Sequence, residues 1–353
     1  MSFQVLAADR ADERASWLAR WEGSEDREPF AHPAYVELFA KAEERALCAH
    51  AAHEGGEVLY PLIRRPLASL PWATGDRAAD LTSPYGYGGP FASGSAVGQG
   101  DEFWRSFDNW SADEGIVTSF TRLSLFETQL PGLPAAADAL FPNVVRSLEL
   151  DEEGLWRDYA HKVRKNVNKA KRSGLRVEID ETGARLTDFL SIYASTMDRR
   201  DAREDYYFPE TFFRTIVERM PGSYVFAHVL DGDHVVSTEL VLRSRHYLYS
   251  FLGGTLAEAF DKRPNDLLKH EVTLWGMSAG LRAYVLGGGY GEADGIFRYK
   301  LSFAPQGEHP FRVLRRVHDT AGLERLLALR AADAERSGAT VQPRDGFFPP
   351  YRS

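Results

Sequence analysis

Residues 151–177 read DEEGLWRDYAHKVRKNVNKAKRSGLRV, and this stretch decides how the rest of the chain is interpreted. It begins with three acidic residues, and from Tyr159 to Val177 it carries seven basic residues and no acidic one. Its apolar residues recur at intervals of three and four, which predicts a helix over 151–174 that buries one face. Gly174 is a typical stop signal for such a helix. The apolar residues are Leu155, Trp156, Tyr159, Val163, Val167 and Ala170.

A second face of the predicted helix is cationic. Lys162, Lys165, Lys169 and Arg172 follow one another at steps of three and four, and Arg164 lies beside them. A solvated amphipathic helix is the ordinary interpretation of such a pattern. In this chain, however, the net charge is −9, so a polyanion can bind only at a local basic patch, and this helix is the long candidate. We therefore expect these side chains to bind phosphates.

The composition sets the class of protein. A chain of 353 residues is long enough for two domains, and 44% hydrophobic with 26% charged residues is typical of a globular protein. The single cysteine, Cys48, excludes an intramolecular disulfide and a cysteine-based zinc cluster. The N-terminal residues carry charges where a signal peptide needs an apolar core, and no run is long enough to span a membrane. We expect a cytoplasmic protein.

Hydrophobic periodicity predicts an α/β protein in which helices and strands alternate along both halves of the chain. Turn-forming residues dominate 80–90, which reads DLTSPYGYGGP, and 130–142. Helices are expected at 11–21, 32–41, 102–114, 186–199, 209–220, 264–279 and 321–337. Strands are expected at 47–53, 57–64, 118–125, 144–150, 175–179, 224–230, 235–242, 246–252 and 283–286.

Several short motifs, weak singly and specific together, give the chain a family resemblance. The segment WRDYAHKVRKNVNKAKRSGLRV contains the pattern Lys-x-Arg-x-Asn-x-x-x-Ala-x-x-x-Gly-x-x-Val, and TMDRRD follows with two tyrosines close behind. FLGGT, PNDLL, LGGG and FRYKLSF come later in the chain, and SPYGYGGP lies in its first half. In this combination and order the chain resembles the Fem-type (FemABX) aminoacyltransferases and the related FemAB-like N-acyltransferases.

The resemblance implies a fold of two tandem GNAT-like domains, each a mixed, mostly antiparallel sheet flanked by helices. The expected domains are 1–146 on the acceptor side and 147–317 on the acyl-donor side, with a C-terminal helix and tail, 318–353, packing back on the first domain. The implied reaction is transfer of an acyl group, commonly an aminoacyl group from aminoacyl-tRNA, onto an amine. Fold alone does not define the substrate.

The resemblance also suggests which residues act. Lys300 matches the lysine of the family and is expected to neutralise the developing oxyanion or a phosphate at the tRNA acceptor end. A surface lysine at a strand end is the alternative. Arg200, or its neighbour Arg199, is expected to clamp a phosphate, and Asp201 to orient that arginine or accept a proton.

Aromatic residues complete the expected site, although core packing is the usual role of such side chains. Tyr207 is placed with the catalytic residues because it could donate to the oxyanion, and Tyr206 could stack on the substrate. The glycines around Tyr85 and Tyr87 would let the backbone approach a ligand closely, so we assign that segment to the acceptor pocket. Tyr249 and Phe297 are further substrate-binding candidates.

Other kinds of catalytic site have no support in the sequence. We find no Ser-His-Asp, Cys-His or metal-ligand spacing, and the glycines at 287–289 do not form a GxGxxG fingerprint. The Gln/Arg-x-x-Gly-x-Gly/Ala turn with which ordinary GNAT enzymes hold coenzyme A is also missing. Aminolysis of an activated ester needs positioning and electrostatic stabilisation rather than a nucleophilic side chain, so we expect no cofactor and no metal.

Three functions remain open at this point. The first is an aminoacyltransferase that uses aminoacyl-tRNA and an amine-bearing peptide or small molecule. The second is an N-acyltransferase that uses acyl-CoA or an acyl carrier protein, for which the basic helix would be the docking surface. The third is a non-catalytic binding protein of the same fold. The sequence identifies neither the acceptor nor the oligomeric state.

Overall fold

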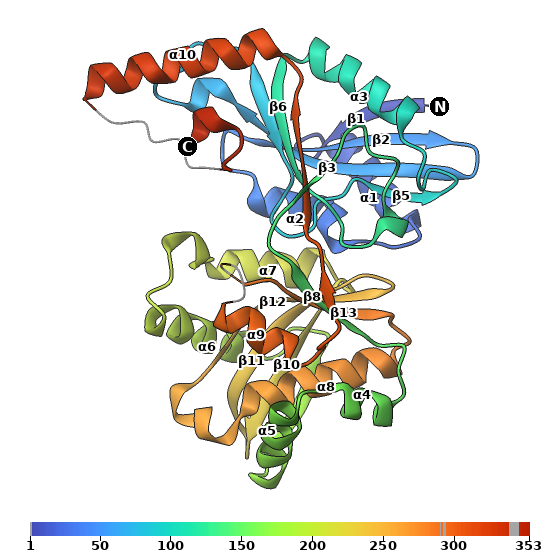
Figure 1. Cartoon of the computed structure of the whole chain (residues 1–353), viewed down its shortest axis with the longest axis vertical. Coiled ribbons are helices and arrows are strands. Elements are labelled where there is room, and N and C mark those ends of the chain that lie inside the picture. Colours follow the sequence, from blue (N-terminus) through green and yellow to red (C-terminus); the bar gives the residue numbers. More distant parts are fainter. Residues whose placement is uncertain (1, 290, 292–293, 339–345) are drawn as a thin grey trace. The chain divides into compact units, whose positions relative to one another are not determined.

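The chain forms two compact units. The computed structural model describes residues 2–289, 291, 294–338 and 346–353 (Figure 1). Unit 1 comprises Met1–Leu140 and Phe311–Ser353, and unit 2 comprises Phe141–Pro310. The sequence placed these boundaries at 146/147 and 317/318, six and seven residues later than the structure does. Residues 339–345 of the expected C-terminal tail lie outside the described residues.

The described strands of unit 1 form one sheet with the order β1-β2-β3-β4-β6-β15-β7, and β5 pairs with β3. All neighbours are antiparallel except β4 and β6. The strands are β1 (Ser2–Ala7), β2 (Arg45–His53), β3 (Gly56–Pro66), β4 (Ala79–Thr82), β5 (Phe91–Gly94), β6 (Ile116–Arg122), β7 (Asp138–Ala139) and β15 (Arg312–Val317). The helices are α1 (Ala11–Gly23), α2 (Pro33–Phe39), α3 (Asp101–Asp113) and α10 (Thr320–Ser337), with 3-10 turns η1 (Pro29–Ala31), η2 (Leu67–Ser69), η3 (Glu127–Gln129) and η6 (Pro350–Arg352).

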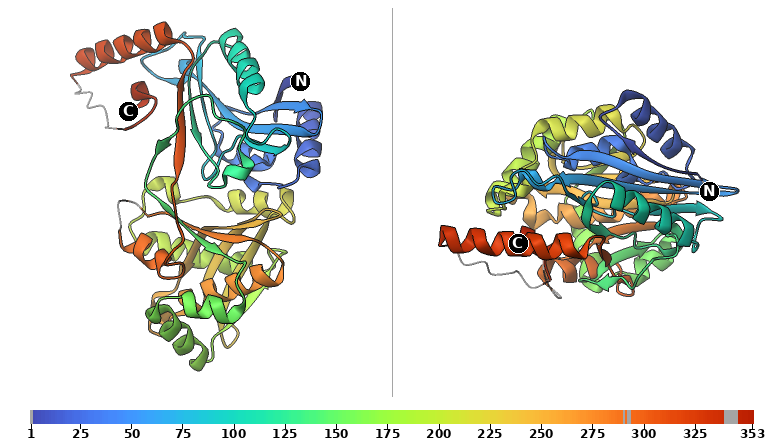
Figure 2. Two further views of the ribbon diagram at one scale, coloured as in Figure 1. Left: turned by 45° about the vertical axis from the view of Figure 1, so that its right-hand side comes forward. Right: turned by 90° about the horizontal axis from the view of Figure 1, so that it is seen from above.

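Helix α3 supplies the aromatic core on one face of the unit 1 sheet. Phe103, Trp104 and Phe107 recur at helical spacing and surround the buried ring of Tyr60, whose centroid lies 5.1 Å from that of Phe107. Helix α10 begins beside β6 (Figure 2), and its Leu326 forms a second buried cluster with Val117 of β6 and with Tyr351 near the C-terminus. The last turn of the chain is therefore part of the unit 1 core.

The described strands of unit 2 form a sheet with the order β14-β8-β13-β12-β11-β10-β9. Again one pair is parallel, β12 with β13, and the others are antiparallel. The strands are β8 (Asn143–Ser147), β9 (Arg176–Asp180), β10 (Tyr224–Asp231), β11 (His234–Arg243), β12 (Tyr247–Thr255), β13 (Ala283–Gly287) and β14 (Glu308–His309). The helices are α4 (Glu152–Asp158), α5 (His161–Arg172), α6 (Leu186–Arg199), α7 (Glu210–Arg219), α8 (Pro264–Ser278) and α9 (Gly295–Leu301), with 3-10 turns η4 (Glu204–Tyr206) and η5 (Ala257–Lys262).

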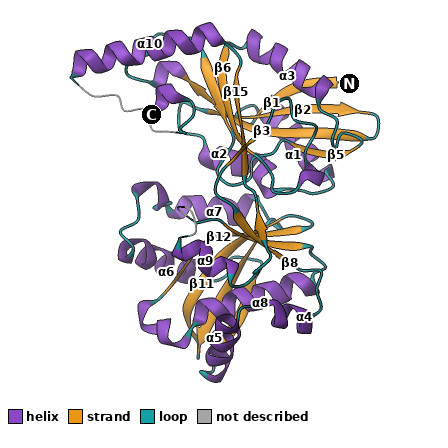
Figure 3. Ribbon diagram, viewed as in Figure 1, coloured by secondary structure: helices purple, strands orange, loops and turns teal. Residues whose placement is uncertain are grey.

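Helices cover both faces of the unit 2 sheet, because strand residues alternate between two apolar sides (Figure 3). Phe226 of β10 points to one side, where its ring centroid lies 5.0 Å from that of Phe189 on α6. Val225 and Ala227 point to the other side and pack in the cluster that contains Leu267 and Leu268 of α8. Two mixed, mostly antiparallel sheets flanked by helices confirm the predicted fold class.

The predicted basic helix is two helices rather than one. Its apolar face is buried as expected, but the chain leaves the helix at Tyr159 and Ala160, which have extended backbone angles between α4 and α5. Tyr159 is 1% exposed, and its ring packs 5.6 Å from that of Phe303. Burial of this large ring and the hydrogen bond from Ala160 N to Ser302 O compensate for the helical hydrogen bonds that are lost at the break.

Other elements differ from the expectation in smaller ways. Residues 79–82, part of the segment expected to be turns, form β4 between β3 and β6. The strands β1, β5, β7, β14 and β15 were not predicted, and Lys300 lies on helix α9 rather than at a strand end. Within the described residues, no helix has both the length and the apolar character needed to cross a membrane.

Candidate active site

The candidate site lies at the end of the unit 2 sheet where the inner strands β12 and β13 terminate. We call this end of the sheet its carboxyl edge, or simply the edge. Because these neighbours are parallel, their carboxyl ends lie at the same edge. They pair only over Tyr247–Tyr249 and Ala283–Val285, and the register of each strand with its other neighbour shifts just beyond, at Phe251 and at Leu286. Such bulges bend strands and redirect side chains at the rims of sheets. This edge is therefore where β12 and β13 stop pairing with each other.

Lys300 lies at this edge, on helix α9. Asp294 accepts a hydrogen bond from Phe297 N (2.7 Å) and so caps the N-terminus of the helix. The Lys300 ammonium donates to the carbonyl oxygen of Gly288 (2.7 Å), directly after the end of β13. Burial, reinforced by the nearby positive charge of Lys269, lowers the pKa of Lys300 to about 8. The side chain is thus a partly desolvated cation that can also release its proton near neutral pH.

A buried polar network lies beneath the edge and was not predicted. Lys269 of α8 donates to Glu239 Oε1 of β11 (2.5 Å), to Ser250 Oγ of β12 (2.7 Å) and to Tyr284 Oη of β13 (3.1 Å). Tyr284 Oη and the Ser250 hydroxyl in turn donate to Glu239. The side chains of Lys269 and Glu239 are 8% and 7% exposed, so all three ammonium protons find buried acceptors. The network ties three strands to α8.

Polar contacts also connect the edge to the basic helix. Asn166 Nδ2 of α5 donates to Asp266 Oδ1 in the first turn of α8 (3.0 Å), and burial raises the pKa of that carboxyl. The adjacent Asn265 donates through Nδ2 to the hydroxyl of Tyr299 (2.9 Å), the residue before Lys300. The N-terminal half of α5 and Lys300 are thus joined through one turn of α8.

The exposed cations of α5 form a stripe that we call the α5 ridge, defined as Lys162, Lys165, Lys169 and Arg172. Among the described residues, no carboxylate lies within ion-pair distance of any of the four. Arg164, which we expected to bind phosphate, instead donates to the carbonyl oxygens of Arg157 (2.9 Å) and Tyr159 at the end of α4. Its donors satisfy helix carbonyls that the break leaves unpaired, so it is a structural residue.

Residues 200–207, which contain the predicted Arg200, Asp201, Tyr206 and Tyr207, directly follow α6. Thr196 of α6 contacts the end of β12, where it accepts a hydrogen bond from Thr255 N (3.2 Å). Arg200, Asp201 and Tyr207 are all exposed, with Tyr207 at 44%, and Asp201 has a left-handed backbone (φ 48°). Tyr206 is half-buried, and its backbone oxygen accepts from the hydroxyl of Tyr193. The segment therefore begins beside the carboxyl end of β12, the same edge that holds Lys300.

Arg199 differs from Arg200 in its contacts. The guanidinium of Arg199 lies 4.9 Å from the centroid of the Phe260 ring and donates to Thr196 Oγ1 at 3.4 Å. Arg200, at the C-terminal cap of α6, makes no ion pair with a described carboxylate. Both arginines are exposed, so either guanidinium remains a candidate for binding an anion.

Two predicted substrate-binding residues are part of the protein interior. Tyr249 is 3% exposed on β12, and Phe297 is 6% exposed in the cluster beneath α9. Phe297 packs α9 onto the sheet and in this way positions Lys300. These side chains support the site from below, because neither has enough accessible surface to bind a substrate directly.

Tyr85 and Tyr87 belong to unit 1, whereas the residues described above belong to unit 2. Tyr85 is 45% exposed, and its ring stacks on that of Phe39 at 6.0 Å. Tyr87 is half-buried between the rings of Phe30 (5.4 Å) and Phe311 (5.6 Å), and burial raises the pKa of its hydroxyl. Tyr85 is thus accessible to a ligand, whereas Tyr87 is mainly a packing residue.

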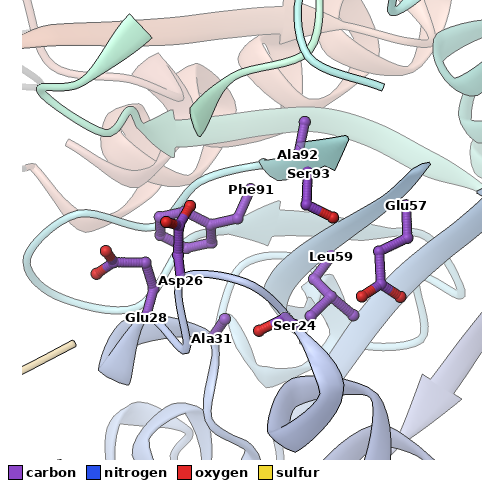
Figure 4. A pocket seen from close by; sticks show the side chains of 9 residues that line it. All are labelled: Ser24, Asp26, Glu28, Ala31, Glu57, Leu59, Phe91, Ala92 and Ser93. Atoms are coloured by element: carbon purple, nitrogen blue, oxygen red, sulfur yellow. The ribbon is translucent and has the colours of Figure 1, made fainter. Parts of the chain in front are cut away.

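Unit 1 also has a shallow acidic pocket, which contains none of the predicted site residues (Figure 4). Its acidic side chains already make internal contacts: Glu28 Oε1 accepts from Gln129 Nε2 (2.7 Å), and Glu57 Oε2 lies 3.2 Å from His50 Nε2. The lining residues are Ser24, Asp26, Glu28, Ala31, Glu57, Leu59, Phe91, Ala92 and Ser93.

The arrangement in unit 2 suits electrostatic rather than nucleophilic catalysis. It places a cation at an open sheet edge, on a helix held by a cap and by a buried ring. Among the described residues, no group of histidine, cysteine, aspartate and glutamate is arranged to hold a metal ion. A fixed positive charge near a reacting carbonyl stabilises the oxyanion of acyl transfer.

Comparison with known proteins agrees with this description. Residues 157–301 match the family model of the acetyltransferase (GNAT) domain. The structure of FemX matches with a TM-score of 0.63 and 12% sequence identity over 93% of this chain and 100% of that one. None of the curated proteins matches this chain.

Two further solved structures have the same fold. The C-terminal domain (DUF2156) of a protein described as a lysylphosphatidylglycerol synthetase, from Agrobacterium fabrum, matches with a TM-score of 0.56 and 14% identity over 92% of this chain and 96% of that one. A protein of unknown function from Bacteroides thetaiotaomicron matches with a TM-score of 0.56 and 10% identity over 88% of this chain and 99% of that one. The resemblance found in the sequence is thus confirmed: residues 157–301 match the acetyltransferase (GNAT) domain, and the chain has the fold of FemX.

Proposed function

We propose that the protein transfers an aminoacyl group from aminoacyl-tRNA to an amine of a peptide or small molecule. The observation that carries this proposal is the α5 ridge, four exposed cations without a carboxylate partner among the described residues of a chain with net charge −9. Such a stripe attracts a polyanion, and the acyl donor of the Fem-type enzymes that this chain resembles is one.

The ridge has a suitable size and position. From Lys162 to Arg172 the helix rises about 15 Å, at about 1.5 Å per residue. Its N-terminal end adjoins the first turn of α8, which contacts Tyr299 next to Lys300. The α5 ridge would therefore neutralise tRNA phosphates close to Lys300, the residue proposed to face the reacting ester.

The reaction needs little more than positioning and charge. The amine attacks the ester carbonyl, a C–N bond forms, and the bond between the carbonyl carbon and the ribose oxygen breaks. The proton lost by the amine ends on the ribose hydroxyl. Lys300, in its ammonium form, stabilises the tetrahedral oxyanion, and in its neutral form it can relay the proton. Arg200 binds a phosphate of the acceptor end, and Asp201 orients it.

A second candidate is an N-acyltransferase that takes an acyl thioester from coenzyme A or a carrier protein. The match of residues 157–301 to the acetyltransferase (GNAT) domain favours it. In that case the α5 ridge would bind the phosphates of coenzyme A or the acidic surface of a carrier protein.

A donor panel tests the proposal. Amide formation with a mixture of amine acceptors is measured with total aminoacyl-tRNA, with the same tRNA after ribonuclease, and with a panel of acyl-CoAs. The proposal expects transfer from intact aminoacyl-tRNA only. Transfer that survives ribonuclease, or that runs on the thioesters alone, would exclude the tRNA donor and support the second candidate.

The ridge itself is tested with paired variants. Lys165→Gln with Lys169→Gln should raise the KM for aminoacyl-tRNA, whereas Arg105→Gln should not. Arg105 is a matched control because it is an exposed cation on a helix of unit 1, and no carboxylate of the described residues pairs with it. If the double lysine variant and Arg105→Gln have the same KM for aminoacyl-tRNA, the α5 ridge does not bind tRNA.

A further inference from the structure

Arg122 in unit 1 is a half-buried cation that has no carboxylate partner among the described residues. It ends β6, and one of its terminal nitrogens donates to the carbonyl oxygen of Ser83 at 3.3 Å, while its guanidinium lies 5.0 Å from the centroid of the Phe120 ring. No carboxylate of the described residues lies within ion-pair distance of it. A guanidinium has five N–H donors, so most of its hydrogen-bonding capacity is unused.

Three other arginines of unit 1, in contrast, have a carboxylate partner. Arg65 pairs with Asp80 at 2.6 Å, and Arg352 pairs with the same carboxylate at 2.6 Å. On the adjacent strand β15, Arg312 pairs with Glu127 at 2.8 Å. Asp80 is fully buried and already shared by two guanidinium groups, so it cannot also compensate Arg122.

The surroundings of Arg122 make its uncompensated positive charge unfavourable. Burial lowers the pKa of Arg122 from its ordinary value, and the positive charge of Arg65 lowers it further, whereas the hydroxyls of Tyr85 and Tyr35 act in the opposite direction. Phe120 offers only a ring face. A partly desolvated cation with no counter-charge is unfavourable, and groups perturbed in this way cluster at functional sites.

The loop beside Arg122 is held in a defined shape. Gly86 has a positive φ of 95°, and a Cβ there would lie 2.5 Å from Phe30 Cε1. At Gly88 a Cβ would lie 2.3 Å from that of Ser83, the residue whose hydroxyl accepts from Arg122 N at 3.0 Å. Only glycine allows these approaches, so the segment packs closely around the end of β6 and pre-organises the environment of the guanidinium.

We propose that Arg122 is the anion-binding residue of a ligand site in unit 1, and that this site takes an oxyanion, a carboxylate or a phosphate, carried by a small molecule or peptide. The planar fork of arginine binds either group through two parallel hydrogen bonds. The exposed ring of Tyr85, fixed through its backbone oxygen by the hydroxyl of Tyr35 at 3.0 Å, would flank the ligand. The site stands on unit 1 alone and does not depend on the acyl donor used in unit 2.

Anion-dependent thermal stability tests this proposal on the full chain. Tm is measured against increasing inorganic phosphate, acetate and chloride at matched ionic strength, for the wild type, Arg122→Gln and Arg45→Gln. Arg45 is the control because Asp9 already pairs with it at 2.9 Å. We expect a saturable rise of Tm with phosphate, acetate or both, an affinity at least about tenfold lower in Arg122→Gln, and no change in Arg45→Gln. A response to phosphate alone identifies a phosphate site, and a response to acetate alone a carboxylate site.

A second measurement separates ligand binding from a structural role. In chloride, Arg122→Gln should melt at the same temperature as the wild type or higher, because the substitution removes a partly desolvated charge that no carboxylate of the described residues compensates. Arg122→Lys, which keeps the charge without the fork, should recover only part of the anion affinity. The proposal is overturned by a Tm lowered by several degrees in Arg122→Gln, by failure of that variant to fold, or by anion titrations identical to those of the wild type.

Discussion

Replacing Lys300 by methionine should stabilise the protein while it stops the reaction. The pKa of Lys300 falls from 10.5 to about 8, and at about 1.4 kcal/mol per unit the folded state carries a penalty of roughly 3 kcal/mol for holding the ammonium. The lost hydrogen bond to Gly288 O offsets about 1 kcal/mol of that gain, and the partial exposure of the side chain offsets some more. We expect the free energy of unfolding at pH 7 to rise by about 1–2 kcal/mol in Lys300→Met.

The sign of this effect depends on pH. Because the folded pKa lies below the unfolded one, the penalty is fully present below about pH 8 and disappears as pH rises toward 10.5. The stability gap between Lys300→Met and the wild type should therefore be constant near neutrality and close above pH 8. The rate of acyl transfer should fall in the variant by about 10² to 10³, the usual cost of removing one oxyanion donor.

Urea unfolding at a series of pH values and steady-state transfer assays measure the two effects. Lys165→Met is the matched control, since its side chain is exposed and its stability should stay within about 0.5 kcal/mol of the wild type. Loss of stability in Lys300→Met, or transfer within a few-fold of the wild type, would refute the reasoning. In that case Lys300 would be an ordinary helix residue.

Three further perturbations address the network, the cap and the ridge. Lys269→Met should lower the free energy of unfolding by about 3–5 kcal/mol in urea melts, because it leaves the buried carboxylate of Glu239 without a counter-charge, and a milder loss would mean that water reaches the carboxylate. Asp294→Ala should cost about 1 kcal/mol and speed amide hydrogen exchange in α9 before the rest of unit 2; uniform exchange would contradict a local cap. Lys165→Gln should reduce the slope of log affinity for tRNA against log salt by about 0.7–0.9, and a slope equal to that of Arg105→Gln would show that the ridge carries no phosphate contact.

Periodic segments were predicted well because burial in them follows a simple repeat. Helix α6 was predicted with the bounds that it has, and β10, β11 and β13 to within one residue at each end. The failures have physical causes. The break at Tyr159 depends on a ring that packs against Phe303, and β15 joins a sheet whose other strands lie far back in the chain. Contacts so distant in sequence leave no local periodicity.

The candidate site was predicted unevenly for a related reason. Lys300 came from a motif, but the network of Glu239, Lys269, Ser250 and Tyr284 did not, although the sequence held a signal for it. Glu239 interrupts an apolar strand, and Lys269 interrupts the apolar run of α8, and charges in such places need partners. Their pairing depends on which strands are neighbours, which the sequence alone did not define. Arg164 was assigned to phosphate binding together with the other basic residues of one predicted helix, whereas its contacts arise at the break between α4 and α5.

The position of β15 affects how the nascent protein matures. This strand lies between β6 and β7 in unit 1, yet the ribosome makes it only after all of unit 2. During synthesis unit 2 has every one of its described strands while β6 still presents an open edge, and an open edge invites pairing with other chains. A polypeptide that stopped at Pro310 would keep that edge permanently. Translational pausing or truncation near this point is therefore expected to produce aggregation rather than a shortened, working enzyme.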